Sequence, residues 1–164
     1  MLAPPAPPSV ARPGLGRARA VVLLVPAALL AGAYGFELIG GLAPCEMCWW
    51  QRYAHFAALG LALASLAAAR SAAGRPLVIL AALAVALSGL IGAYHAGVEA
   101  GWWQGLTSCG ATAGGSLADI LATPVVRCDQ VPWRFAGLSM AAWNAVLSLL
   151  AAGSALWLVG RRGA

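Results

Sequence analysis

Charge is scarce in this chain, and lysine is absent altogether. The 164 residues include ten basic side chains, all of them Arg, and five acidic ones, so that 9% of the residues are charged. A soluble domain usually has about 25% charged residues. With 62% hydrophobic residues, the chain cannot cover a compact water-soluble surface, which excludes soluble and disordered proteins and indicates an integral membrane protein. The scattered arginines form no basic stripe, which excludes a nucleic-acid-binding protein.

Hydrophobic runs of membrane-spanning length occur four times. A helix needs about 20 mainly apolar residues to cross a bilayer. We predict spans at about residues 20–41, 53–69, 77–94 and 138–159. Small residues such as Gly60, Gly89 and Gly92 favour close helix packing in lipid. The predicted fold class is therefore all-α: a single membrane domain over residues 20–160, built as a four-helix bundle.

The arginines also predict an orientation. Seven of them flank the runs on one side: Arg12, Arg17, Arg19, Arg70, Arg75, Arg161 and Arg162. By the positive-inside rule, both termini are predicted to be cytoplasmic and the loops 42–52 and 95–137 periplasmic, in a bacterial inner membrane. The Pro-rich residues 1–19 are predicted to form a disordered cytoplasmic tail. In the alternative, a signal peptide is cleaved near Ala31-Gly32-Ala33.

All four cysteines fall in the two predicted periplasmic loops, where disulfides form and persist. Cys45 and Cys48 lie in the first loop, and Cys109 and Cys128 lie in the second. Pairing within each loop is the natural choice among three possible connectivities. Between the second pair, residues 114–121 carry a capping-box pattern and an apolar face, which predicts a short amphipathic helix on the membrane surface.

The first cysteine pair precedes the second predicted span. Cys48 is expected at the N-terminus of that helix, where free N–H groups and the helix dipole favour a thiolate. Arg52 follows four residues later on the same face and supports the same anion. Such a site can pass electrons between a dithiol and a lipid-soluble acceptor. A zinc site would require a second closely spaced pair, but 18 residues separate Cys109 from Cys128, so we predict no metal.

Several of these features together resemble the disulfide bond formation protein B (DsbB) family. They are Pro44-Cys45-x-x-Cys48-x-x-x-Arg52 before the second of four spans, a second cysteine pair in the following outer loop, and Trp133-x-Phe135-x-Gly137-Leu138-Ser139-Met140 after Cys128. The resemblance implies an enzyme that reoxidises a periplasmic DsbA-like thioredoxin-fold protein and reduces ubiquinone or menaquinone. Glu37, near the outer end of the first span, departs from the pattern, because the resemblance leads us to expect Gln there in some relatives.

The resemblance also implies residue roles. Cys109 would form the mixed disulfide with the reduced partner, and the released Cys128 would attack Cys45. Cys48 would then face the quinone as a thiolate, with Arg52 and His95 near the ring oxygens.

Other side chains, and two other functions, stay open at this stage. His55 is expected to be packed in the second span, and Asn144 to make an interhelical hydrogen bond. The chain could instead be a non-catalytic membrane anchoring or assembly protein with structural disulfides. It could also be a quinone enzyme like vitamin K epoxide reductase, although there we expect the cysteine motif on a late helix.

Overall fold

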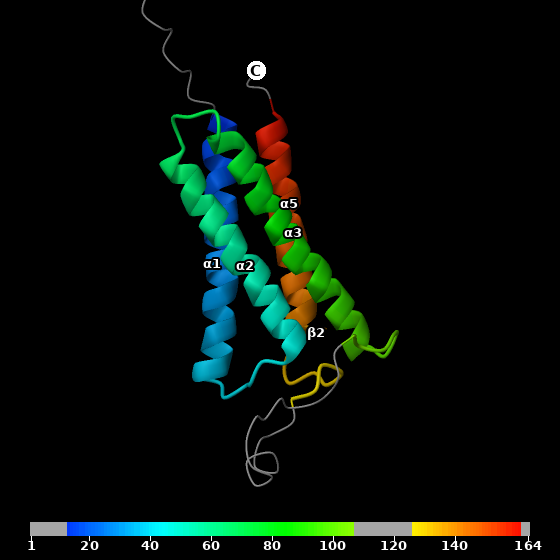
Figure 1. Ribbon diagram of the computed structural model, residues 1–164. Helices are drawn as coiled ribbons and strands as arrows, with labels where there is room; N and C mark the ends of the chain where they lie inside the picture. Colours follow the sequence, from blue (N-terminus) through cyan, green and yellow to red (C-terminus); the bar gives the residue numbers. More distant parts are fainter. Residues whose placement is uncertain (1–12, 107–125, 162–164) are drawn as a thin grey trace, which may run out of the picture.

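A computed structural model describes residues 13–106 and 126–161. Within these ranges the chain forms four long helices: α1 (Pro13–Leu38), α2 (Glu46–Ala67), α3 (Gly74–Glu99) and α5 (Met140–Gly160). A short antiparallel hairpin, β1 (Arg134–Phe135) and β2 (Leu138–Ser139), precedes α5. The start of α1 and the end of α5 lie at one end of the bundle, whereas the α1–α2 connection and the hairpin lie at the other (Figure 1).

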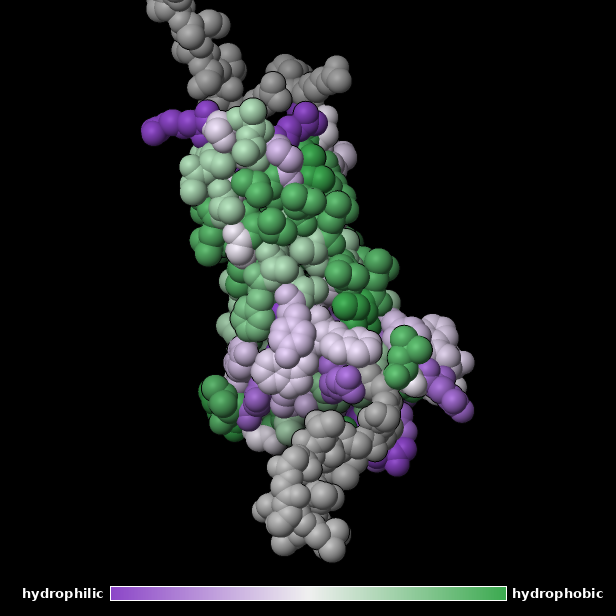
Figure 2. Space-filling view, in the orientation of Figure 1, coloured by the Kyte–Doolittle hydropathy of each residue, from purple (hydrophilic) through white to green (hydrophobic). Residues whose placement is uncertain are grey.

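Three of the described helices are long and apolar enough to cross a membrane: Gly14–Leu38, Gly74–Glu99 and Met140–Gly160. The first two turns of α2 are more polar, because they contain Glu46, Gln51 and Arg52. Hydrophobic side chains cover the middle of the visible face, and hydrophilic residues gather toward its two ends (Figure 2). A multi-pass membrane protein has this distribution, since its middle contacts lipid.

The helices extend beyond the predicted spans. α1 begins at Pro13, so residues 13–19 are helical, contrary to the prediction of a disordered tail for them. α2 begins at Glu46 and includes most of the predicted first loop. α3 runs on to Glu99, beyond the predicted span boundary. Hydropathy detects only the apolar part of a helix, whereas backbone hydrogen bonding continues into the more polar ends.

Small side chains fill the helix interfaces, while many leucines face outward. The largest buried cluster consists of Ala18, Val22, Ala62, Val78, Ala81, Ala82 and Ala155. The packing role predicted for Gly89 and Gly92 is confirmed, because a Cβ there would lie 2.9 Å from Leu149 Cγ and from the Ala141 carbonyl, respectively. The same prediction for Gly60 is wrong: nothing lies within 4 Å of its Cβ position.

The hairpin turn requires left-handed backbone at two consecutive residues. Ala136 has φ 49° and Gly137 has φ 81°, as in the tight turns that suit the twist of a two-residue hairpin. Ser139 ends the hairpin and caps α5 by accepting a hydrogen bond from the Ala142 N–H (3.1 Å). The hairpin region thereby brings Trp133 against Phe36 of α1, with ring centroids 4.7 Å apart.

Candidate active site

The C-x-x-C motif forms the start of α2. Cys45 is the N-cap residue, and its Sγ accepts a hydrogen bond from the Cys48 N–H at 3.4 Å. The Sγ atoms of Cys45 and Cys48 are 3.0 Å apart, so a small movement would reach the 2.05 Å typical of a disulfide. The predicted place of Cys48 at a helix N-terminus is therefore confirmed.

The two thiols differ in acidity. A hydrogen bond to Cys48, together with burial, raises the pKa of Cys45 from 9.0 to about 12. The pKa of Cys48 is lowered, chiefly by the hydrogen bond from Cys45, with smaller contributions from the backbone and from Arg52. Cys48, which precedes the apolar run of α2, is thus the thiol of this pair that more readily becomes a thiolate.

Arg52 is a buried cation held by α1 and by its own helix. It is 6% exposed and forms an ion pair with Glu37. Its Nη2 donates to the Ala33 carbonyl at 3.3 Å. Its guanidinium carbon lies 4.6 Å from the Tyr34 ring centroid and 4.9 Å from that of Trp49. These contacts hold a delocalised positive charge in place at the end of the bundle that contains Cys48.

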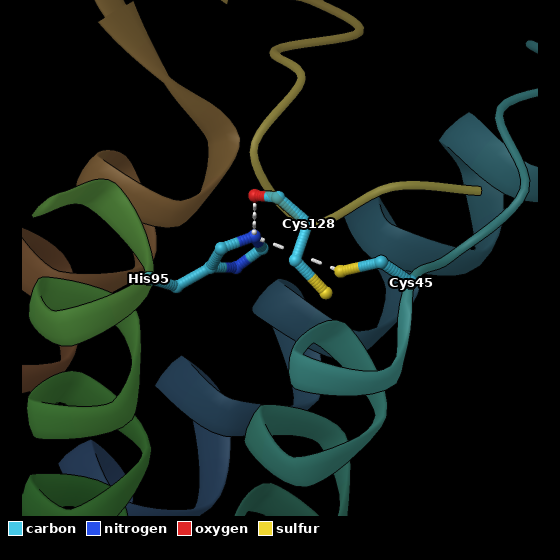
Figure 3. A group of neighbouring side chains, drawn as sticks. All are labelled: Cys45, His95 and Cys128. Atoms are coloured by element: carbon cyan, nitrogen blue, oxygen red, sulfur yellow. Dashed lines mark hydrogen bonds between the residues drawn. The ribbon is translucent and has the colours of Figure 1, made fainter. Parts of the chain in front are cut away.

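His95 connects the start of α2 with the loop that contains Cys128. It projects from α3, and its Nε2 lies 3.1 Å from the Cys128 carbonyl oxygen and 3.6 Å from Cys45 Sγ (Figure 3). Each of the three residues presents one potential metal-binding atom, and these atoms all lie within 4.8 Å of one another. The structure therefore places the second-loop sulfur beside the Cys45–Cys48 pair.

A mostly apolar cavity of about 340 Å³ lies beside these groups. Its lining includes Cys45, Cys48, Arg52 and His95 together with the aromatic side chains Phe36, Trp133, Phe135 and Trp143. Ligand pockets of small organic molecules have this size and this mixture of apolar walls with a few polar groups. Five of the six residues predicted for the site are thus gathered around one sulfur pair and one cavity.

Several polar residues at the site had no assigned role in the sequence analysis. The Gln51 side chain lies between His95 and Asn144 and forms a hydrogen bond with each of them. The interhelical hydrogen bond predicted for Asn144 is confirmed, because it contacts Gln51 and His55 of α2 and Ser88 of α3. Glu37 and Glu99 were also missed as partners of Arg52 and His95. Glu37 and Glu99 stand at the ends of α1 and α3, and Gln51 lies in the polar first turns of α2, so hydropathy gave little signal for them.

Cys109 and the predicted surface helix at residues 114–121 lie outside the described residues.

Comparison with known proteins agrees with the motif. The family model of disulfide bond formation protein DsbB matches residues 16–158. Relatives named disulfide bond formation protein B include that of Xanthomonas euvesicatoria, which is 36% identical over 142 residues, covering 80% of each chain. That of Marinobacter nauticus is 31% identical over 163 residues, covering 87% of this chain and 90% of the relative. That of Aromatoleum aromaticum is 33% identical over 151 residues, covering 82% of this chain and 89% of the relative. No solved structure matches the chain.

Proposed function

This chain belongs to the DsbB family of membrane proteins that function in disulfide bond formation, and we propose that it reoxidises a periplasmic DsbA-like dithiol oxidase and passes the electrons to ubiquinone or menaquinone. One observation carries this proposal. The Cys45–Cys48 pair lies beside Cys128 and also lines the cavity that contains Arg52. Electrons can therefore arrive through one sulfur and leave through another.

The proposed topology has four spans, with both termini in the cytoplasm and the cysteines in the periplasm. α2 has 22 residues, which at about 1.5 Å per residue is long enough to cross the hydrocarbon core. The start of α1 and the end of α5 share one end of the bundle (Figure 1). Arg17 and Arg19 near that start and Arg161 at that end favour the cytoplasm for it.

In the proposed relay each step is an exchange between a thiolate and a disulfide. The reduced partner attacks Cys109 of the Cys109–Cys128 disulfide and releases Cys128 as a thiolate. Cys128 attacks Cys45 Sγ, so that the Cys128–Cys45 bond forms while the Cys45–Cys48 bond breaks. The electron pair of the broken bond leaves on Cys48 Sγ, the sulfur whose pKa is lowered.

The cavity residues fit a quinone. The apolar and aromatic walls suit a lipid-soluble ring, and the buried Arg52 guanidinium suits its oxygens, as does the His95 imidazole. A bound quinone supplies a two-electron acceptor. Arg52 would hold the Cys48 sulfur in its charged form on the cavity side, and the aromatic walls would exclude water from it.

The energetics also favour a quinone. A DsbA-like oxidase has a reduction potential of about −120 mV, and each 30 mV corresponds to about 1.4 kcal/mol for a two-electron couple. Regenerating so strong an oxidant requires an acceptor that is more oxidising still, which an ordinary protein disulfide is not.

The test uses purified full-length protein in detergent micelles, a reduced thioredoxin-fold oxidase and ubiquinone-1, with the quinone absorbance followed over time. We expect turnover with the native protein and none with Ser at any of the four cysteine positions. Full activity of Cys48→Ser would refute the proposed relay. Absence of quinone consumption by the native protein, with disulfides that resist mild reductants, would instead favour an anchoring protein with structural disulfides.

A further inference from the structure

A buried chain of hydrogen bonds connects α5 to the sulfur pair through α2 and α3. Asn144 Nδ2 lies 2.8 Å from Gln51 Oε1, and Gln51 Nε2 lies 3.0 Å from His95 Nδ1. The opposite nitrogen of His95 faces Cys45 and Cys128. Gln51 and His95 are 7% and 3% exposed, so water does not offer alternative partners.

Backbone carbonyls determine which atom of each amide is the donor. Asn144 Nδ2 donates to the Ser88 carbonyl oxygen at 3.1 Å, and Gln51 Nε2 donates to the Met47 carbonyl oxygen at 3.1 Å. A carbonyl oxygen only accepts, so the nitrogen of each amide must point where the structure has it. In addition, Asn144 Oδ1 accepts from the Ser148 hydroxyl at 3.1 Å. Neither amide can flip without losing several bonds at once.

The fixed direction of Gln51 determines the form of His95. Because the second N–H of Gln51 points at His95 Nδ1, that nitrogen must be the acceptor and has no hydrogen of its own. The proton of a neutral imidazole is then on Nε2. The surroundings of Nε2 agree, since they are the Cys128 carbonyl at 3.1 Å, Cys45 Sγ at 3.6 Å and Glu99 Oε1 at 3.8 Å.

We propose that Gln51 is a positioning residue that holds His95 as the Nε2–H tautomer, so that the imidazole donates to the Cys128 carbonyl and toward Cys45 Sγ instead of binding a metal. The cluster of Cys45, His95 and Cys128 has metal-ligand spacing, but a metal needs the Nε2 lone pair. A metal-binding histidine normally donates its other N–H to an acceptor, and here that place holds a donor. Gln51 thus keeps the sulfurs available for exchange.

The function of this tautomer rests on the proposed relay. One N–H that reaches both the backbone of Cys128 and the sulfur of Cys45 holds the attacking residue beside its target. It does so through hydrogen bonds alone, so no covalent bond to the imidazole has to be broken later. In the relay, Gln51 therefore acts only through His95.

The first experiment measures the tautomer directly. The full-length protein is labelled with ¹⁵N-histidine, reduced completely and studied by NMR in micelles, without partner or quinone. The chain has two histidines, and a His95→Asn variant assigns the signals of His55. We expect Nε2 of His95 to carry the proton and Nδ1 to be unprotonated. Protonated Nδ1 with unprotonated Nε2 in the native protein would overturn the proposal.

The second experiment changes the donor. In Gln51→Glu a carboxylate replaces the amide, so Nδ1 gains a proton and Nε2 becomes available to a metal. We expect the reduced variant to bind Co²⁺ at least tenfold more tightly than the native protein, as for other changes beside a ligand histidine. Gln104→Glu adds the same charge at an exposed position and should change neither the tautomer nor the Co²⁺ affinity.

The outcomes are separable from those of the quinone assay, because neither measurement involves catalysis. If Gln51→Glu leaves both the tautomer and the Co²⁺ affinity unchanged, Gln51 does not determine the form of His95. Should Gln51→Glu fail to fold, Gln51→Met removes the amide without adding charge. In that variant we expect a mixture of the two His95 tautomers, and an unchanged Nε2–H form would contradict the proposal.

Discussion

Alkylation of the fully reduced protein at graded pH is expected to modify Cys48 well before Cys45. The thiolate is the reactive form, and the hydrogen bond from Cys45 lowers the pKa of Cys48 while the pKa of Cys45 is raised to about 12. The rate at Cys48 should therefore stop rising with pH below the ordinary value of 9.0. The rate at Cys45 should continue to rise about tenfold per pH unit beyond it.

The size of the difference follows from the two acidities. At pH 7 a thiol with the ordinary pKa of 9.0 is about 1% thiolate, and one with a pKa of about 12 is about 0.001% thiolate. This ratio of about 1000 between the two thiolate fractions is a lower bound, since the pKa of Cys48 lies below 9.0. A more basic thiolate is intrinsically more nucleophilic, with a Brønsted coefficient of about 0.5, which reduces the advantage of Cys48 to about 30-fold.

A matched pair of variants isolates the cause. Cys45→Ala removes the hydrogen bond to Cys48, and a hydrogen bond to a charged group contributes about 1.5–3 kcal/mol. The thiolate fraction of Cys48 at pH 7 should then fall about tenfold, at the lower end of that range because Cys48 is half-buried. With the same Brønsted coefficient, its alkylation should slow about threefold. Cys45→Ser retains a donor and should preserve most of the native rate.

The assay is mass spectrometry of each cysteine after timed exposure to iodoacetamide between pH 5 and pH 10. Differences in access change the rates but not their pH dependence, so the pH at which each rate levels off is the decisive quantity. Equal behaviour of Cys45→Ala and Cys45→Ser, or a Cys45 rate that levels off before that of Cys48, would refute the assignment.

Further predictions concern the ion pair and the helix packing. Glu37→Gln leaves Arg52 without its countercharge and should lower the free energy of unfolding in micelles by about 3 kcal/mol, the lower end for a buried pair because the Glu37 side chain is 24% exposed. Arg52→Ala should chiefly raise the apparent KM for quinone in steady-state assays, with a smaller effect on kcat. Gly92→Ala should destabilise the protein by about 1–3 kcal/mol in thermal unfolding, since its Cβ would meet the α5 backbone at 2.9 Å. Gly60→Ala, with open space around it, should have no such cost.

Much of the helical framework could be predicted from hydropathy alone. The apolar runs locate three helices of membrane-spanning length, and the position of Cys48 at the start of α2 follows from the motif. Helix ends could not be predicted as well, because polar residues such as Glu46 and Gln51 lie on α2 although they interrupt its hydrophobicity. Composition also cannot distinguish a glycine that faces another helix from one that faces outward. For this reason the packing role predicted for Gly60 is wrong.

Part of the site could also be predicted, but from the spacing of residues along one helix and not from hydropathy. Local spacing brings Cys45, Cys48 and Arg52 together, because one or two helical turns separate them. The contacts of Glu37 with Arg52 and of Gln51 with His95 depend on how α1, α2 and α3 pack. Nothing in the spacing of a single sequence specifies those pairs. The direction of the Gln51 amide depends further on individual backbone carbonyls, which only coordinates supply.

The alanine-lined half of the bundle has a consequence for the compartments that the membrane separates. Ala18, Ala62, Ala81 and Ala155 are almost completely buried there and belong to one apolar cluster. About 20 residues of α2 separate Cys48 from its far end, which is about 30 Å of helix. In the proposed topology this half acts as an insulator: reductants in the cytoplasm would not reach the sulfurs, and the protein could stay oxidised beside a reducing cytosol.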